Sequence, residues 1–547
     1  MKMMKKALFV MLTVAVIACV FVICSVTGSA ADIIASGECG KGGYPSCNGN
    51  KNISWTLDSD GLLVISGTGD IKHDDDRTDN YCWLDYSSKI KSIVIEDGIT
   101  SISENFFYYC NNLANIKIAD SVETIGDNAF SGCSRLTEIN IPDSVETIGD
   151  NAFSGCSGLT EINIPDSVTT IGDYAFSDCS GLTEITIPDS VTTIGAFAFE
   201  RCSQLMQLTI NARNFTVGNY AFFGCGSDTE GMNVIFGDSV ELIPDSIMSN
   251  LVNIKSLLIG KNVQSIGNSA FSGCSGLTEI IIPDSVTIIG NSAFGGCSGL
   301  TEINIPNSVT TIGNRTFSGC SDIEAVVIGK SVKVIGENAF YNCDSITSVT
   351  MGDSVEAIKQ LAFAGCKSLK NIVIPETVEY IGASAFSGTA LEKIVINNPK
   401  CVIEYNADTI PVDAVIYGHV NSPAQMYAQM YGRDFVPLSA GECEHTYSEW
   451  VIDADATCTQ RGFAHRVCTL CNGYEFDVID ETGHIDDDAD NICDVCDEVL
   501  STQTPDTDDG GESGENNSSD GIFSFFASIK ELFNRIISWF RTIFGMV

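Results

Sequence analysis

Apolar and polar positions recur along this chain with a period of 23 residues. The segment 136–156 reads LTEINIPDSVETIGDNAFSGC, and the segment that starts at Leu159 repeats it almost without change. The opening Leu-Thr-Glu-Ile-Asn-Ile alternates apolar and polar residues, which predicts a short β-strand. Pro142 cannot donate a backbone hydrogen bond, so we expect the strand to end there.

The second half of each copy predicts a turn and a short helical segment. Val145 and Ile148 would point inward beyond the proline, and Gly149 suits a backbone with positive φ. Residues 151–155 predict one helical turn on the convex side of the array. The phenylalanine of this turn, Phe153, would stack on its equivalents in other copies, such as Phe176, Phe271 and Phe386.

One cysteine marks almost every copy and shows how the copies are spaced. Eleven cysteines occupy this position: Cys110, Cys133, Cys156, Cys179, Cys202, Cys225, Cys274, Cys297, Cys320, Cys343 and Cys366. The step from Cys225 to Cys274 is two periods plus three residues, so one copy near 228–253 carries an insertion. We count about 14 units between residues 90 and 398. Because a single unit cannot bury its apolar face alone, the units are expected to stack into a solenoid.

The units resemble the BspA-type leucine-rich repeat of bacterial surface proteins, through the pattern L-x-x-I-x-I-P-x-S-V-x-x-I-G-x-x-A-F-x-x-C. Residues 53–69 resemble the segment that often precedes such arrays, and residues 416–438 resemble their C-terminal cap. We therefore expect an α/β fold: a right-handed solenoid with one short parallel strand and one short helical turn per repeat, then a small Cys/His-rich module. The resemblance also implies a secreted or surface-attached interaction protein, best known for adhesion, and no enzyme activity.

The chain divides into seven segments on this basis. In order, they are a signal peptide (1–31), an N-terminal cap (32–89), the repeats (90–398), a C-terminal cap (399–439), a Cys/His-rich module (440–500), an acidic disordered linker (501–521) and an amphipathic helix (522–547). The signal peptide is predicted from three early lysines, the apolar run 7–26 and the small residues 28–31. An uncleaved membrane anchor and a lipoprotein box at Cys19 are the alternatives. We expect an exported protein.

The composition narrows the classes of partner. The chain has 29 basic and 71 acidic residues, a net charge of −42, while 44% of its residues are hydrophobic. It can therefore bury a large core under an acidic surface. Such a surface argues against nucleic-acid binding, which needs lysine and arginine. It admits basic partners and divalent cations, and five histidines leave few candidates for histidine-based catalysis.

Outward strand positions form the candidate ligand-binding surface, on the concave face of the solenoid. They stack into columns of threonine, glutamate and asparagine: Thr137, Glu138, Asn140, Thr160, Glu161, Asn163, Thr183, Glu184, Thr278, Glu279, Thr301 and Glu302. Adjacent glutamates repel one another, and a basic partner or cations would relieve that repulsion. The regular columns favour a repetitive ligand, such as host or bacterial surface proteins or glycans. A solvated polar face without a ligand is the alternative.

The repeat cysteines allow three interpretations: disulfides, metal ligands or buried thiols. Each cysteine faces two equivalent neighbours, and eleven of them cannot all pair among themselves. A free cysteine behaves as a small buried hydrophobe, so we favour structural thiols. No cofactor is expected in the solenoid.

The segment 440–500 carries a different cysteine pattern. Two CxxC pairs approximate a four-cysteine zinc ribbon. Its ligands would be Cys468, Cys471, Cys493 and Cys496, with His445 and His484 as alternates. Disulfides in an exported module are the other interpretation. The acidic residues Asp486, Asp488 and Asp490 begin a calcium-loop pattern, but Asn491 stands where that loop needs glycine, which weakens a calcium assignment.

The last segment, 522–547, is apolar and aromatic, with polar residues spaced alternately by four and three. This spacing predicts an amphipathic helix that contacts a membrane surface peripherally. Self-association or partner docking is the alternative. For the whole chain we expect adhesion or protein and glycan recognition through the solenoid. The alternative is a structural, metal-holding envelope protein without a dedicated ligand; no G-x-S-x-G, HExxH or P-loop motif indicates an enzyme.

Overall fold

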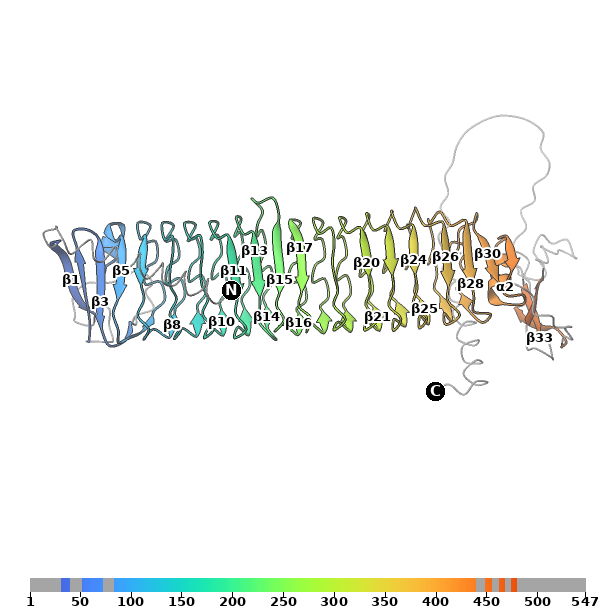
Figure 1. Ribbon diagram of the computed structural model, residues 1–547, viewed down its shortest axis with the longest axis horizontal. Helices are drawn as coiled ribbons and strands as arrows, with labels where there is room; N and C mark the ends of the chain where they lie inside the picture. The colour runs from blue at the N-terminus through green and yellow to red at the C-terminus, as the bar shows by residue number, and fades with distance from the viewer. Residues whose placement is uncertain are drawn as a thin grey trace, which may run out of the picture. The chain divides into compact units, whose positions relative to one another are not determined.

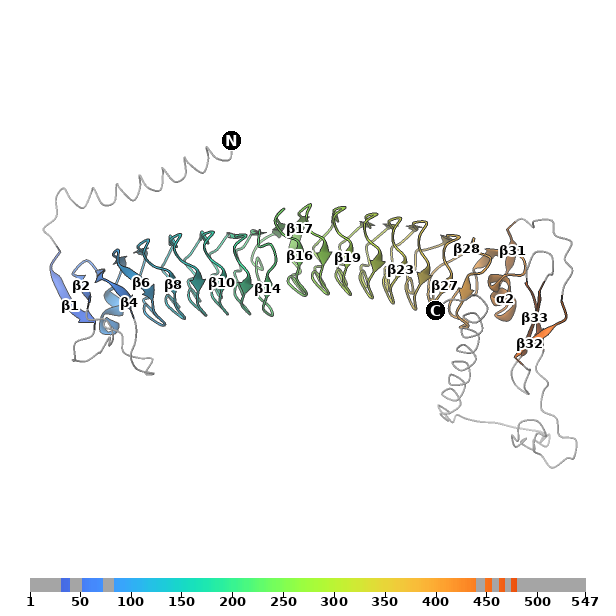
Figure 2. The same cartoon turned by 90° about the horizontal axis from the view of Figure 1, so that it is seen from below.

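The computed structural model describes residues 31–39, 52–71, 83–438, 448–454, 462–467 and 474–479. Between residues 52 and 438, the chain winds into a solenoid whose turns follow one another along a nearly straight axis (Figures 1 and 2). From β3 onward, equivalent strands of successive turns pair in parallel. The parallel-strand solenoid predicted from the sequence is confirmed.

A first series of strands uses the Leu-x-x-Ile-x-Ile opening within the repeats and continues into both end segments, where its first two strands pair antiparallel. Its members are β1 (Ile33–Cys39), β2 (Ile53–Asp58), β3 (Leu62–Gly67), β5 (Ser92–Ile95), β7 (Asn115–Lys117), β11 (Glu184–Ile187), β13 (Gln207–Ile210), β15 (Met232–Phe236), β17 (Ile254–Ile259), β20 (Glu302–Asn304), β22 (Ala325–Val327), β24 (Ser348–Thr350), β26 (Asn371–Ile374), β28 (Lys393–Ile396), β30 (Val415–Gly418) and β31 (Phe435–Pro437). Isolated bridges join Asn140 to Asn163 and Glu161 to Glu184 in turns without a full strand. We call the outward side of this series the first-sheet face.

A second series of short strands uses the Thr-Ile pair before the repeat glycine. Seven strands form one parallel sheet: β4 (Gly69–Ile71), β6 (Ile99–Ile102), β8 (Thr124–Ile125), β9 (Thr147–Ile148), β10 (Thr170–Ile171), β12 (Thr193–Ile194) and β14 (Thr216–Val217). Eight more form another: β16 (Leu242–Ile243), β18 (Ser265–Ile266), β19 (Ile288–Ile289), β21 (Thr311–Ile312), β23 (Val334–Ile335), β25 (Ala357–Ile358), β27 (Tyr380–Ile381) and β29 (Val402–Ile403).

The third side of each turn is not helical, so the predicted helical turn is wrong. Asn151 and Gly155 have φ angles of 55° and 73°, which interrupt a right-handed helix twice within five residues. Alternate backbone N–H groups instead donate to the next turn, as Phe153 N–H does to Ala175 O at 2.7 Å. The described residues contain only η1 (Leu84–Lys89) and α2 (Pro423–Met430) as helices, so the protein is mostly β rather than α/β.

The repeat glycine is required for a different reason from the one predicted. Gly149 is not among the residues with positive φ. A Cβ atom at this position would lie 2.7 Å from the backbone nitrogen of Asp127 in the preceding turn. Close approach of two backbones therefore excludes a side chain there.

Stacked side chains fill the interior between the three sides. Phe153 and Phe176 lie with ring centroids 5.2 Å apart and nearly parallel planes, and the same stacking joins Phe363 to Phe386 at 5.7 Å. This confirms the predicted phenylalanine spine. The twelve cysteines from Cys110 to Cys401 that the structure describes are all free and buried, in agreement with the structural-thiol interpretation.

Both ends of the solenoid are covered by aromatic residues. Trp83 is buried, stacks on Phe107 at 5.5 Å and donates from Nε1 to the carbonyl oxygen of Phe106 at 3.1 Å. At the other end, Ser422 caps α2, and the buried Tyr427 hydroxyl donates to Asn406 O at 2.8 Å. These contacts end the stack without leaving an open core.

The second series is interrupted once, between β14 and β16, although β13, β15 and β17 of the first series stay paired there. Elsewhere the repeat glycine donates to the previous turn, as Gly218 does to Ile194 O at 2.8 Å. Pro244 occupies this position after β16 and has no N–H to donate. Met248 also replaces the spine phenylalanine here.

Three further strands, β32 (Val451–Ala454), β33 (Gly462–Val467) and β34 (Tyr474–Ile479), form a separate small sheet in the order β32-β33-β34. They are the part of the predicted Cys/His-rich module that the structure describes, and they contain none of its proposed ligands. The described residues therefore do not support the Cys/His-rich module of the predicted fold.

The predicted metal ligands all lie outside the described residues. For zinc, these are Cys468, Cys471, Cys493 and Cys496, with the alternates His445 and His484. For calcium, they are Asp486, Asp488 and Asp490. The signal peptide, the linker 501–521 and the helix 522–547 also lie outside the described residues, apart from Ala31. These assignments stay predictions.

Candidate recognition surface

The predicted binding residues lie on the first-sheet face, in adjacent turns. Their side chains are exposed, except that Thr183 is half-buried. The pairing of Asn140 with Asn163, and of Glu161 with Glu184, places these polar side chains one strand apart in continuous columns. Threonine hydroxyls follow the same order, since Thr183 Oγ1 donates to Thr160 O at 3.3 Å. The N-terminal half of the face is therefore polar, acidic and regular.

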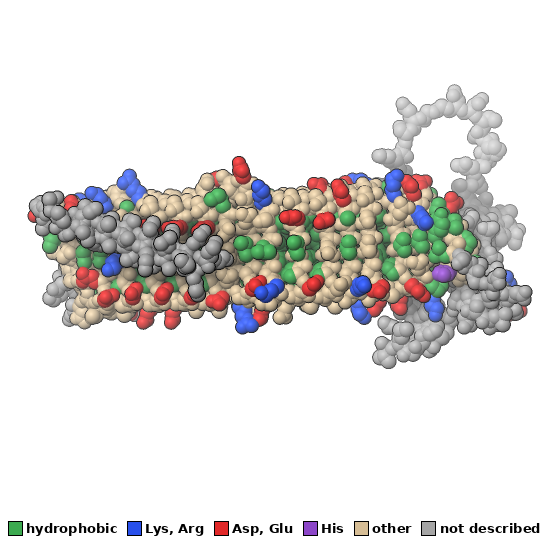
Figure 3. All heavy atoms as spheres, in the orientation of Figure 1, with side chains coloured by type: hydrophobic (Ala, Val, Ile, Leu, Met, Phe, Trp, Pro, Cys, Tyr) green, Lys and Arg blue, Asp and Glu red, His purple; other side chains and the backbone are tan. Residues whose placement is uncertain are grey.

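A column of exposed apolar side chains on the same face was missed by the sequence analysis. After Thr209 the position of Asn140 is apolar in several turns, since Thr209 pairs with Ile235 and Ile235 pairs with Leu258. Polar residues return at Asn304 and Thr350, on either side of Val327. Farther along, four side chains are strongly exposed: Leu258 (58%), Ile281 (80%), Val327 (44%) and Val373 (55%). Figure 3 shows hydrophobic side chains gathered along the right-hand half of this face.

The signal for this column was present in the repeat pattern. The turn that starts at Leu277 reads Leu-Thr-Glu-Ile-Ile-Ile, so Ile281 stands where the copies that start at Leu136, Leu159 and Leu300 have asparagine. An outward strand position that turns apolar breaks the alternation of a half-buried strand. Several exposed apolar side chains gathered on one face of a soluble protein commonly mark an interaction site.

A hollow of about 320 Å³ opens beside the apolar column, at the carboxyl ends of β20, β22 and β24. Its lining includes Val327, Met351 and Lys330. Gly329 and Gly352 stand where other turns have proline, as at Pro306, so two side chains are missing from this part of the surface. The hollow can receive an apolar side chain that projects from a partner, with Lys330 at its rim.

Two lysine pairs lie at the C-terminal end of the face, and Lys117 and Lys255 are exposed nearer its N-terminal end. Lys370 Nζ lies 2.8 Å from Glu392 Oε1, and this hydrogen bond raises the pKa of Lys370. Lys393 Nζ lies 4.4 Å from the ring centroid of Tyr417. Both pairs are intramolecular and occupy these two lysines. Among the described residues, the charges without an ion-pair partner nearest the apolar column are Lys255, Glu279 and Glu302.

The buried thiols do not provide a reactive centre. Cys156 Sγ donates to Phe130 O at 3.2 Å, and burial raises the pKa of the Cys156 thiol well above its usual range. A thiol in this environment is neither a nucleophile nor a metal ligand at neutral pH. Within the described ranges, no group of three or more His, Cys, Asp or Glu side chains is placed to hold a metal ion.

The repeat pattern and the solenoid geometry agree with a known family. The model of the BspA type leucine-rich repeat region matches residues 78–206, 193–324 and 287–407, which together span more than half of the chain. The chain belongs to this family. BspA-type repeats form scaffolds for protein interaction. No curated protein matches the chain.

Solved structures of other leucine-rich-repeat proteins are similar to this chain. A protein from Bacteroides ovatus is 29% identical, with a TM-score of 0.51 over 71% of this chain and 99% of that one. One from Eubacterium ventriosum is 25% identical, with a TM-score of 0.34 over 65% and 96%. A leucine-rich cell surface protein from Faecalibacterium prausnitzii is 23% identical, with a TM-score of 0.29 over 73% and 96%. Among the described residues, no helix is long and apolar enough to cross a membrane.

Proposed function

We propose that this BspA-type protein is a non-enzymatic adhesion protein, exported to the cell surface or beyond it. It recognises a protein partner through the first-sheet face. The observation that carries this proposal is the exposed column of Leu258, Ile281, Val327 and Val373 on a face that is otherwise polar. Export rests on the predicted signal peptide.

The side chains of the first-sheet face favour a partner protein with apolar anchor residues next to basic residues. The apolar column and the hollow beside Val327 favour a partner that presents apolar anchor side chains. Glu279 and Glu302 are exposed in the neighbouring column, so basic residues beside those anchors would be attracted. The threonine, glutamate and asparagine columns farther along extend this contact over several turns. A long contact of this kind suits repetitive or fibrous surface proteins.

Binding of the full chain to immobilised fibronectin, fibrinogen, laminin and mucin tests the proposal. The double variant Ile281→Asn, Val327→Asn removes the two central apolar side chains of the column and introduces a residue that other copies already carry at this position. We expect its affinity to fall about tenfold or more, which corresponds to about 1.4 kcal/mol. Charge reversal by Glu279→Lys and Glu302→Lys should slow association and reduce its dependence on salt.

The matched control is Ile288→Thr, which removes an exposed isoleucine from the second sheet and restores the residue common there. It should bind as the wild type does. If no protein of the panel binds the wild type, or if the Asn double variant binds equally well, the first-sheet face is not the recognition surface.

A further inference from the structure

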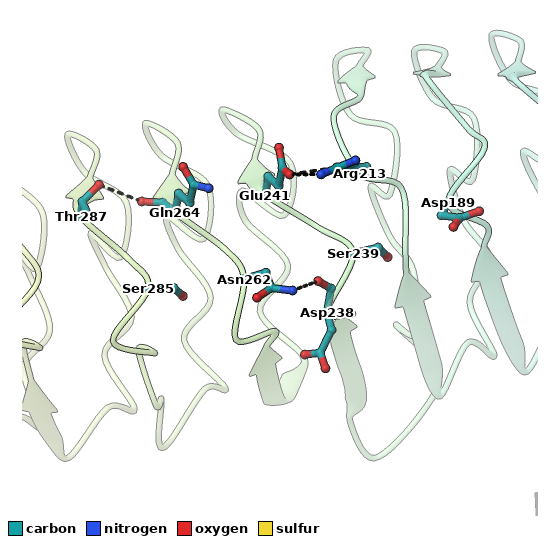
Figure 4. A pocket seen from close by; sticks show the side chains of 9 residues that line it. All are labelled: Asp189, Arg213, Asp238, Ser239, Glu241, Asn262, Gln264, Ser285 and Thr287. Atoms are coloured by element: carbon teal, nitrogen blue, oxygen red, sulfur yellow. Dashed lines mark hydrogen bonds and ion pairs between the residues drawn. The ribbon is translucent and has the colours of Figure 1, made fainter.

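A second hollow lies away from the first-sheet face, on the segments that connect the two series of strands. It has a volume of about 710 Å³, within the range of small-molecule sites, and it opens at the break between β14 and β16. Figure 4 shows Arg213 and Glu241 on one side of it and Asp238 and Asn262 on the other.

The sequence of one connecting segment explains the hollow. In regular turns this segment has an exposed aspartate, as at Asp143, Asp166 and Asp189. In the segment after β13, Ala212 takes that position and is buried, and Phe215 is buried three residues later. Because this segment turns apolar side chains into the core, it leaves a depression between Asp189 and Asp238.

Most charges that line the hollow are already neutralised. Arg213 donates from Nε and Nη2 to Glu241 Oε1 at 2.8 and 2.6 Å. Asn214 Nδ2 donates to the other carboxylate oxygen of Glu241 at 3.1 Å, so the guanidinium and the carboxylate are held in place. Asp238 pairs with Lys261 at 2.8 Å. These pairs leave the Asp189 carboxylate as the one charged group of the lining without an ion-pair partner among the described residues.

Three polar groups remain available to a ligand. The side-chain amide of Gln264 and the carboxylate of Asp189 have no hydrogen-bond or ion-pair partner among the described residues. Asn262 Nδ2 donates to Asp238 O at 2.8 Å, which leaves its Oδ1 as an acceptor. Together they offer donors and acceptors along several successive turns, and a hydroxyl group can match either kind.

We propose that this hollow binds a neutral, hydroxyl-rich oligosaccharide that lies along the solenoid axis. Sugar hydroxyls donate to Asp189 and Asn262 and accept from the Gln264 amide. The unpaired carboxylate of Asp189 would repel a phosphate or sulfate group. The hollow is also unsuited to an apolar ligand, since its lining consists of charged, amide and hydroxyl side chains. The site is separate from the protein-binding face and does not depend on it.

Calorimetry and saturation-transfer NMR of the full chain test this site, with maltotriose, chitotriose and lactose as neutral probes and 3′-sialyllactose as a charged probe. We expect at least one neutral probe to bind saturably. The variants Asp189→Ala and Gln264→Ala should each weaken it about tenfold or more. Asp143→Ala changes the same repeat position two turns away and should leave binding unchanged.

Two results would overturn the site: no binding of the neutral probes, or binding that survives the combined Asp189→Ala, Gln264→Ala substitution. Binding of 3′-sialyllactose alone would also overturn it, because the Asp189 carboxylate should disfavour an anion. The double variant Ile281→Asn, Val327→Asn should retain saccharide binding, which separates this site from the proposed adhesion surface. Because the substituted side chains at 189 and 264 are exposed, circular dichroism should show an unchanged fold.

Discussion

At the scale of single residues, the repeat cysteine combines a small apolar volume with a weak hydrogen-bond donor. Cys179 Sγ donates to Phe153 O at 3.1 Å, and other copies repeat this bond between successive turns. Thr389 takes the cysteine position in the last repeat and donates to Phe386 O at 2.8 Å. A donor that satisfies a buried carbonyl oxygen is therefore the common requirement of the position.

Burial of the thiols predicts a loss of stability at alkaline pH. Desolvation raises the pKa of Cys110 and of Cys343 to about 12, from the ordinary value of 9.0. Above about pH 9 the unfolded chain releases thiol protons that the folded protein retains, so the free energy of unfolding falls as pH rises toward 12. Each such thiol contributes a slope of about 1.4 kcal/mol per pH unit.

Urea unfolding at pH 8, 9 and 10 in the presence of reductant measures this slope. The variant Cys343→Thr keeps a buried hydroxyl donor but removes one titrating thiol. Above pH 9, the free energy of unfolding of this variant should fall less steeply with pH than that of the wild type. The difference in slope should correspond to about one bound proton. An identical slope in both proteins would show that burial of this thiol does not couple to folding.

At the scale of one repeat, the contacts between turns depend on glycine where backbones approach closely. A Cβ atom at Gly290 would lie 2.6 Å from the backbone nitrogen of Asn268 and 2.7 Å from the carbonyl carbon of Gly267. The nearest backbone must therefore move to accommodate any side chain. The sequence pattern marked the glycine as common to most copies but assigned the wrong cause, because periodicity within one turn contains no information about distances between turns.

The same repeat contains a matched pair of glycines for a test. We expect Gly290→Ala to destabilise the protein by about 1–3 kcal/mol, the usual cost of forcing extra atoms into a packed interface. Gly295→Ala should be nearly neutral, because its Cβ would meet only Arg315 O at 3.3 Å and Ser292 O at 3.5 Å. Other copies carry serine at the position of Gly295. Thermal and urea unfolding of both variants measure the loss of unfolding free energy. Equal destabilisation by the two substitutions would contradict the backbone-contact explanation.

At the scale of the whole molecule, the interruption between β14 and β16 separates two regular stretches of second sheet. In a solenoid each turn is stabilised mainly by its two neighbours, so a missing ladder bond weakens the coupling between the two stretches. Paired strands of the first series, β13 with β15, still cross the interruption. Local opening is therefore expected to begin on the second-sheet side of these turns.

Hydrogen exchange read by mass spectrometry tests this expectation. Peptides that cover 211–217 and 237–243 should exchange faster than those that cover 142–148 and 165–171. The regular pair β9 and β10 provides the internal control, since its hydrogen bonds are intact. Equal protection in the two regions would show that the first series alone maintains the coupling.

Much of this architecture could be predicted from the sequence, because a 23-residue period is repeated many times. The strand, the phenylalanine spine and the buried cysteine each follow from a residue that recurs in one turn. The apolar column was missed, since its four residues depart from the consensus in separate copies, and only their positions in space show that they share one face. The hollow beside Arg213 was missed because it results from an irregular turn, for which the repeat pattern provides no template.

The near identity of neighbouring turns has a consequence for the gene that encodes them. Turn 136–158 presents to its successor the same backbone donors and acceptors that turn 159–181 presents to the next. Loss or duplication of whole 23-residue units by recombination would preserve the hydrogen bonds between successive turns. It would change only the length of the solenoid, by about 4.8 Å per unit. The three extra residues near 228–253 are different, because they coincide with the broken second sheet. The length of the solenoid can therefore vary between strains by whole repeats, while the interruption between β14 and β16 is retained.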